Sequence, residues 1–264
     1  MKNNWTIIKF GGSILSPDPD KADTKRFPEY SIPFDYDFSI SFLKLLKVSQ
    51  DKNLIDKVIV IVGGGYLNKS YLKTTLNYIE KEKDLSQVSD DLKDLIGSAS
   101  IALNAHIFLA LATGLLGEEN VYQDTLKYSD YDRLNDINIK KYNSLVIAAA
   151  CGAGHSSDTN AMNIAKAFRV KKVISLKNVD GVYDSDPDEN PKAKKYDKLN
   201  WKEYKEILGG AEYEPRSHFP VDVIATDLAD KSNTDFLIMD GRDLGNFEEY
   251  LTKKDFIGTI ITNK

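Results

Sequence analysis

The sequence places polar side chains directly after a short apolar run, an arrangement suited to phosphate binding. The run Leu145–Ala150 is followed by Cys151, Gly152, Ala153, Gly154, His155, Ser156, Ser157 and Asp158, and then by a helical apolar pattern. Serine and aspartate are favoured at helix starts, where free backbone N–H groups form an anion site. This stretch therefore predicts a helix N-terminus able to hold a phosphate.

Two glycine turns near the start of the chain also follow strand-like runs. Trp5–Phe10, which contains Lys9, leads into Gly11 and Gly12, and Val58–Val62 leads into Gly63–Gly65. Adjacent glycines let the backbone approach a bulky group, and a lysine adds a point charge. A strand, three glycines and a polar helix start have the layout of a phosphate cradle, although a glycine triplet by itself is not specific to one. A plain glycine turn with a solvated lysine is the alternative for the first turn. The glycine triplet of the second turn has neither the P-loop nor the Rossmann pattern.

The apolar runs predict the elements that must position these turns. We expect strands over 5–10, 58–62, 145–150, 173–176, 236–239 and 258–261, and helices over 38–49, 91–114, 201–207, 220–232 and 244–251. This alternation predicts parallel pairing with helices on both faces, a three-layer αβα sandwich around a mainly parallel sheet. Because α/β proteins bind ligands at the carboxyl edge of such a sheet, the turns should meet there.

Composition narrows the class of protein. The chain has 264 residues, 42% of them hydrophobic, a net charge of −5 and a single cysteine, Cys151. These values indicate a globular protein, argue against a nucleic-acid surface and exclude an intrachain disulfide, which favours a cytoplasmic setting. No uninterrupted apolar run approaches 18 residues, so we expect no membrane span. The proline-rich stretch Ser16–Asp37 is expected to be a surface excursion or a lid.

Several separate motifs agree on one family. KFGGS, VGGG, GHSSD, KNVDGVYDSDP and a terminal GTII occur in that order, and through them the chain resembles the amino-acid kinase superfamily over nearly its whole length. Within it, GGGYLNKSY, DLIGSASIALNA and CGAGHSSD resemble the uridylate kinases, especially the archaeal type. The resemblance implies one domain, with an acceptor-binding half over about 1–143 and an ATP-binding half over about 144–264. It implies ATP-dependent phosphorylation of UMP to UDP in pyrimidine nucleotide biosynthesis, Mg²⁺ carried mainly by ATP rather than by a protein metal site, and a homohexamer.

The resemblance also implies roles for individual residues. Lys9 and Asp158 would be catalytic, because phosphoryl transfer depends on positioning and on charge placed against the transferring group. The ATP-binding residues would be Lys9, Gly11, Gly12, Gly65, Lys69, Lys177, Tyr183 and Asp186. The UMP-binding residues would be Gly64, Asp94, Cys151, Gly152, Ala153, Gly154, His155, Ser156 and Ser157.

The chain departs from the family pattern at four positions. Lys69 and Ala102 stand where arginine is usual, Cys151 stands where threonine is usual, and Ala153 replaces a proline. Two alternatives therefore accompany the uridylate kinase interpretation. One is another small-molecule phosphate kinase, such as an isopentenyl phosphate kinase, although no histidine follows the glycine triplet here. The other is a nucleotide- or anion-binding protein of the same fold without catalysis.

Overall fold

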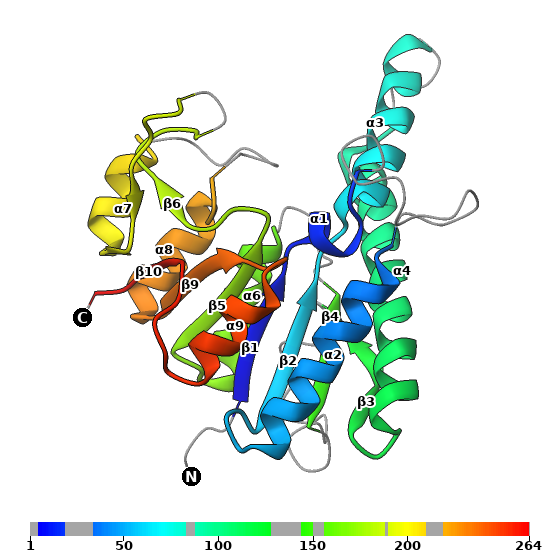
Figure 1. Cartoon of the computed structure of the whole chain (residues 1–264). Coiled ribbons are helices and arrows are strands. Elements are labelled where there is room, and N and C mark those ends of the chain that lie inside the picture. Colours follow the sequence, from blue (N-terminus) through cyan, green and yellow to red (C-terminus); the bar gives the residue numbers. More distant parts are fainter. Residues whose placement is uncertain are drawn as a thin grey trace.

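The central element of the molecule is one long mixed sheet, shown in Figure 1. The computed structural model describes residues 5–18, 34–82, 88–127, 144–149, 156–187, 190–209 and 219–263. Within them the strand order is β3-β4-β2-β1-β5-β9-β10-β8. These strands are β1 (Trp5–Phe10), β2 (Lys57–Val62), β3 (Val121–Leu126), β4 (Leu145–Ala149), β5 (Lys172–Lys177), β8 (Lys198–Leu199), β9 (Asp235–Asp240) and β10 (Thr259–Ile261). A small hairpin, β6 (Val182–Tyr183) with β7 (Lys195–Tyr196), lies outside this sheet.

The prediction of a mainly parallel sheet is confirmed, but extending parallel pairing to every strand is wrong at β10. The pairs from β3 to β9 are parallel, whereas β10 runs antiparallel to β9. The cause lies in the preceding helix, α9 (Leu244–Leu251). Asn246, in its first turn, donates to the Ile257 carbonyl at 2.7 Å and accepts from the Ile257 N–H at 2.7 Å. This pins the chain at the carboxyl edge before β10 begins, so β10 runs back.

Helices cover both faces of the sheet, as the alternation predicted. One face carries α2 (Tyr36–Asp51), the lower part of α4 (Asp90–Leu116), and α9. The other face carries α6 (Ser157–Phe168), α7 (Trp201–Ile207) and α8 (Val223–Ser232). Successive strand residues point to opposite faces, so Ile7 packs in one core and Ile8 in the other. The result is a three-layer αβα sandwich with two apolar cores.

Caps set the helix boundaries that the apolar pattern placed only approximately. The α2 helix begins at Tyr36 because the Asp35 carboxylate accepts from the Phe38 N–H at 2.9 Å. The α8 helix begins at Val223, three residues later than expected, because Asp222 caps it and accepts from the Ala225 N–H at 2.9 Å. The lid expectation for Ser16–Asp37 falls largely on residues 19–33, outside the described residues.

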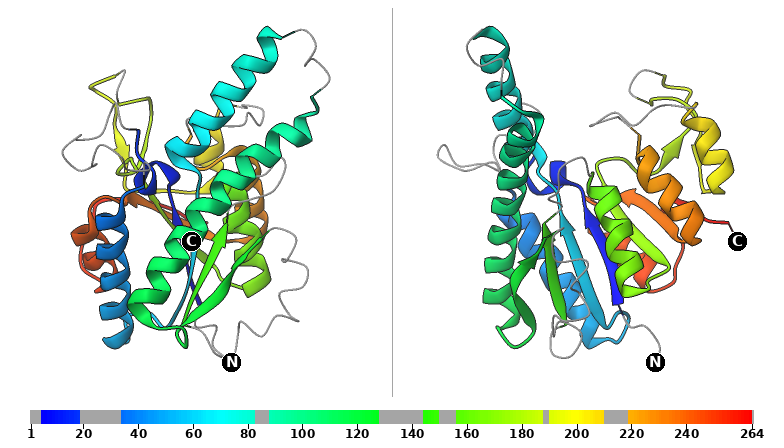
Figure 2. Two further views of the ribbon diagram at one scale, coloured as in Figure 1. Left: turned by 90° about the vertical axis from the view of Figure 1, so that its right-hand side faces the viewer. Right: turned by 180° about the vertical axis from the view of Figure 1, so that it is seen from behind.

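The α3 helix (Gly65–Lys81) and the first half of α4 form a hairpin that projects beyond the sheet (Figures 1 and 2). Asn68 joins the two helices, donating to the Gly97 carbonyl at 2.8 Å and to the Ser100 hydroxyl at 2.9 Å. In α4, Asp94–Leu116 is long and apolar enough to cross a membrane by length and composition alone. Its second half, however, packs on the sheet through Phe108 and Ala112, as a core helix does.

Candidate functional site

Two lysines meet one aspartate at the carboxyl edge of the sheet. Lys9, in β1, lies 2.8 Å from one oxygen of Asp158, and Lys177, at the end of the neighbouring strand β5, lies 3.1 Å from the other. Lys9 and Asp158 are only 4% and 5% exposed. The connections after β1 and β5 lead to opposite sides, to β2 and towards β9, which makes this a topological switch point.

The contacts within this cluster shift the pKa values of Asp158 and Lys177. Burial disfavours the ionised form of Asp158, but Lys177 and Lys9 outweigh it and hold the pKa of that carboxyl below its ordinary value. Burial also lowers the pKa of Lys177 to about 8, against the attraction of Asp158 and with the repulsion of Lys9. Two ammonium groups therefore flank one carboxylate in a buried cluster. The three groups together carry one net positive charge, which can attract an anion.

The N-terminus of α6 carries Asp158 and is braced by a residue that the sequence interpretation missed. The Ser156 hydroxyl accepts from the Asp158 N–H at 3.1 Å and the Thr159 N–H at 3.0 Å, which confirms the predicted helix start. The same hydroxyl donates to Asp222, the N-cap of α8, and the Thr159 hydroxyl donates to it at 3.3 Å. Asp222 is 5% exposed. An aspartate before the run Val-Ile-Ala predicts that Asp222 caps a helix. No neighbouring residue in the sequence predicts its second hydrogen bond, from Ser156.

The two glycine turns interlock. A methyl group on Gly12 would lie 2.2 Å from the Gly65 nitrogen and 2.8 Å from the Gly64 nitrogen. Gly65 has a φ of +59°, and a methyl group there would lie 2.2 Å from the Gly12 carbonyl oxygen. Only glycine fits this approach at both positions. The Gly11 N–H donates to the Leu176 carbonyl at 2.8 Å, which ties the first turn to the end of β5.

Asn104, in α4, forms hydrogen bonds with the second glycine turn, Gly63–Gly65. Its side-chain NH₂ donates to the Gly64 carbonyl at 2.9 Å and to the Gly63 carbonyl at 3.2 Å, and the residue is fully buried. These two hydrogen bonds point the Gly63 and Gly64 carbonyls toward Asn104 and so fix the orientation of the peptide groups in the turn. Asn104 therefore positions the backbone of this turn.

The described site residues divide into two groups. Lys9, Gly11, Gly12, Gly64, Gly65, Asp158 and Lys177 come together at the carboxyl edge, with Ser156 and Ser157 at the adjoining start of α6. Lys69 and Asp94 are exposed on the projecting hairpin, and Tyr183 and Asp186 follow β5 in the outer loop. Cys151, Gly152, Ala153, Gly154 and His155 lie outside the described residues.

Tyr183 is held within its own loop. Its hydroxyl donates to Asp180 at 2.7 Å, and this hydrogen bond raises the pKa of Tyr183 to about 12. Lys195, on the facing strand β7, lies 3.2 Å from the other oxygen of Asp180. Asp180 therefore links the two strands of the β6–β7 hairpin through Tyr183 and Lys195. The predicted nucleotide contacts of Tyr183 and Asp186 stay predictions.

The comparisons with known proteins cover the whole chain. A protein named uridylate kinase from Thermoplasma volcanium is 27% identical over 262 residues, 99% of each chain, and another from Methanosarcina barkeri is 29% identical over 267 residues, 98% of each. The solved uridylate kinase of Archaeoglobus fulgidus has a TM-score of 0.71 at 22% identity, covering 97% of this chain and 100% of that one. The UMP kinase of Ureaplasma parvum has a TM-score of 0.73 at 20% identity, covering 100% of both chains. Residues 4–240 match the model of the amino acid kinase family. The chain therefore belongs to the amino acid kinase family.

Proposed function

We propose that this protein is a kinase that transfers the γ-phosphoryl group of ATP to UMP, giving ADP and UDP. The observation that carries the proposal is the buried Lys9–Asp158–Lys177 cluster, which lies beside two interlocked glycine turns and a helix N-terminus. Relatives named uridylate kinase along the full chain support the choice of acceptor. We place the reaction in the cytoplasm, in pyrimidine nucleotide biosynthesis.

The geometry suits an in-line transfer. Lys9 and Lys177 present positive charge where negative charge spreads over the transferring phosphoryl group, and Asp158 keeps both ammonium groups in place. Glycine-turn N–H groups and the positive end of α6 add donors that need no reorganisation. ATP is held by the half over about 144–264 together with the first glycine turn, and UMP by Gly64, Asp94 and the loop before α6.

Mg²⁺ is proposed to enter with ATP. Both oxygens of Asp158 already contact lysines, so this carboxylate is not available to hold the ion. The phosphate oxygens of ATP and water would supply the ligands, which suits a cation that keeps several waters. We expect EDTA to abolish UDP formation and added Mg²⁺ to restore it; UDP formation unchanged in EDTA would contradict this.

A panel of acceptors tests the substrate assignment. UMP, CMP, dUMP, isopentenyl phosphate and water would each be offered with ATP and Mg²⁺, and products separated by anion-exchange chromatography. We expect UDP from UMP as the fastest reaction. Faster turnover of isopentenyl phosphate would mean that this compound, and not UMP, is the acceptor. Nucleotide binding without any ADP release would indicate a non-catalytic protein.

The contact between the glycine turns gives a prediction with a matched control. Gly12→Ala would push a methyl group into the Gly63–Gly65 backbone and displace the cradle by about 1 Å, so we expect kcat/KM to fall about 10²-fold. Gly114→Ala, in a helix where the new methyl group meets nothing within 4 Å, should leave kcat/KM unchanged and stabilise the fold by about 0.5–1 kcal/mol. Equal activity of the two variants would count against the cradle.

The lowered pKa of Lys177 predicts a pH dependence. Lys177 is charged below its pKa of about 8 and neutral above it, so a phosphate-binding role requires kcat/KM to fall as the pH rises through this value. Arginine stays charged over this range, so Lys177→Arg should move the fall to higher pH. The measurement is a pH profile of kcat/KM from pH 6 to pH 10 for both proteins. An identical alkaline fall in Lys177→Arg would assign it to another group.

We propose that the protein is a homo-oligomer, a hexamer by resemblance, with the projecting half of α4 as one interface. Leu92, Leu95 and Leu103 lie on one side of this helix, and their exposed fractions are 53%, 61% and 46%. A second copy would cover this apolar strip. Light scattering after size-exclusion chromatography should show an oligomer that Leu95→Lys/Leu103→Lys dissociates; a monomeric wild type would contradict this.

A further inference from the structure

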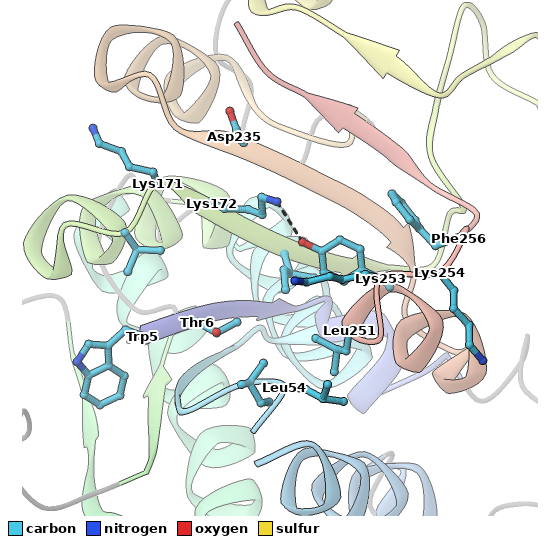
Figure 3. Close-up of a pocket in the computed structure, with 14 residues that line it drawn as sticks. Trp5, Thr6, Leu54, Lys171, Lys172, Asp235, Leu251, Lys253, Lys254 and Phe256 are labelled. Carbon is cyan, nitrogen blue, oxygen red and sulfur yellow. Dashed lines mark hydrogen bonds between the residues drawn. The ribbon is translucent and has the colours of Figure 1, made fainter. Parts of the chain in front are cut away.

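A pocket lies at the amino ends of the central strands, on the opposite edge of the sheet from the lysine–aspartate cluster. Its volume is about 660 Å³, within the range of small-molecule sites. Figure 3 shows its walls: Trp5 and Thr6 at the start of β1, Lys171 and Lys172 at the start of β5, and the segment that follows α9. Its position makes it a second site, because β1 and β5 begin here and reach the cluster only about 15 Å further on, at ~3.3 Å per residue.

Four lysines and one carboxylate, Asp235, line the pocket, so the lining carries an excess of three positive charges. Lys171 donates to the Ser232 carbonyl at 2.7 Å and Lys172 to the Tyr250 hydroxyl at 3.3 Å, both neutral partners. Among the described residues, none of Lys171, Lys172, Lys253 and Lys254 forms an ion pair. The lining carboxylate, Asp235, accepts from the Thr262 hydroxyl at 2.6 Å.

This local charge stands out because the whole chain is acidic, with a net charge of −5. Figure 3 shows Lys172 and Lys253 near the middle of the pocket, whereas the side chains of Lys171 and Lys254 extend outward from its two ends. Two neighbouring ammonium groups in the middle match linked phosphates better than a single carboxylate.

The remaining walls are apolar. Leu54, Leu251 and Phe256 line the pocket beside the lysines, and Leu54 is 37% exposed although it is a large aliphatic side chain. Phe256 stands edge-on to Tyr250, with ring centroids 5.1 Å apart. Cationic donors beside apolar and aromatic surface suit a ligand that has both an anionic and an uncharged, ring-containing part.

We propose that this pocket binds a small organic polyphosphate, with its phosphates on Lys172 and Lys253 and its organic part against Phe256. The lysines supply charge-assisted hydrogen bonds, and the apolar wall supplies contact area. The site is separate from the reaction proposed above and does not depend on it.

The test uses the whole protein with UMP and a non-hydrolysable ATP analogue at saturating concentration, so that the reaction site is filled. Inorganic tripolyphosphate and UTP are the probes, titrated by calorimetry. We expect one further equivalent of each to bind, UTP more tightly, and Lys172→Gln/Lys253→Gln to weaken both at least about tenfold, since the variant removes two charge-assisted hydrogen bonds. Lys202→Gln, at an exposed lysine on α7, is the control and should change neither.

Lysine acetylation followed by mass spectrometry locates the probe independently of affinity. Tripolyphosphate should protect Lys172 and Lys253 and leave Lys202 unprotected. No extra equivalent bound, or binding that is unchanged in Lys172→Gln/Lys253→Gln, would overturn the site. Equal affinity for UTP and tripolyphosphate would overturn the part assigned to the apolar wall.

Discussion

Replacing Lys9 by methionine should reduce kcat/KM about 10³-fold, on the order of 4 kcal/mol of transition-state stabilisation. Lys9 is 4% exposed and its ammonium lies 2.8 Å from Asp158, so its charge acts in a dry setting beside the glycine turns. Methionine keeps most of the volume and removes the charge. The fold should survive, because Asp158 still pairs with Lys177 at 3.1 Å. Steady-state kinetics and far-UV circular dichroism measure the two effects.

Lys57→Met is the matched control for this variant. Lys57 also lies on a central strand, but at the amino end of β2, where its ammonium stands over the Trp5 ring at 5.4 Å. We expect its kcat/KM to stay within about twofold of the wild type, as for a surface change away from the site. A Lys9→Met enzyme with wild-type kcat/KM would contradict the phosphate role of Lys9.

Asp158→Asn should impair both catalysis and stability. The amide cannot neutralise the two buried ammonium groups, so we expect unfolding to become easier by about 3–5 kcal/mol, as when one partner of a buried ion pair is removed. Activity should fall about 10³-fold, because repulsion moves Lys9 and Lys177 apart. Chemical denaturation and kinetics at pH 7 measure the two changes.

The double variant Lys9→Met/Asp158→Asn separates the two effects. Removing one ammonium relieves the repulsion, so its free energy of unfolding should recover part of the loss while its activity stays low. This sign of coupling is expected of residues in direct contact. A double variant less stable than Asp158→Asn would mean that Asp158 does not serve mainly to separate the two lysines.

Elements fixed by local signals could be predicted from the sequence. The bounds of β1, α7 and α9 match the predictions. The α7 helix is bounded by a capping box in which Asn200 and Glu203 bond reciprocally, and such a signal is complete within four residues. The convergence of Lys9, Gly12 and Asp158 at one edge also follows from parallel topology alone, because carboxyl ends share an edge.

Features that depend on long-range partners could not be predicted. Asn246 sets the direction of β10 by bonding to Ile257, and Asp222 braces Ser156 from 66 residues away. Neither hydrogen-bonded pair produces a periodic pattern in the sequence from which the contact could be predicted. Asn104 is a polar residue within the apolar helix α4, and only its bonds to Gly63 and Gly64 show what it does.

The most direct measurement follows the terminal phosphorus atom of ATP through a single turnover. ATP labelled in the γ-phosphate would be mixed with excess enzyme, Mg²⁺ and UMP, and the products quenched and separated. We expect the label in the β-phosphate of UDP, one UDP for each ADP, and transfer about 10³-fold slower in Lys9→Met. Label released as inorganic phosphate, or transferred equally well by Lys9→Met, would contradict the proposal that the Lys9–Asp158–Lys177 cluster carries a phosphoryl group from ATP to UMP.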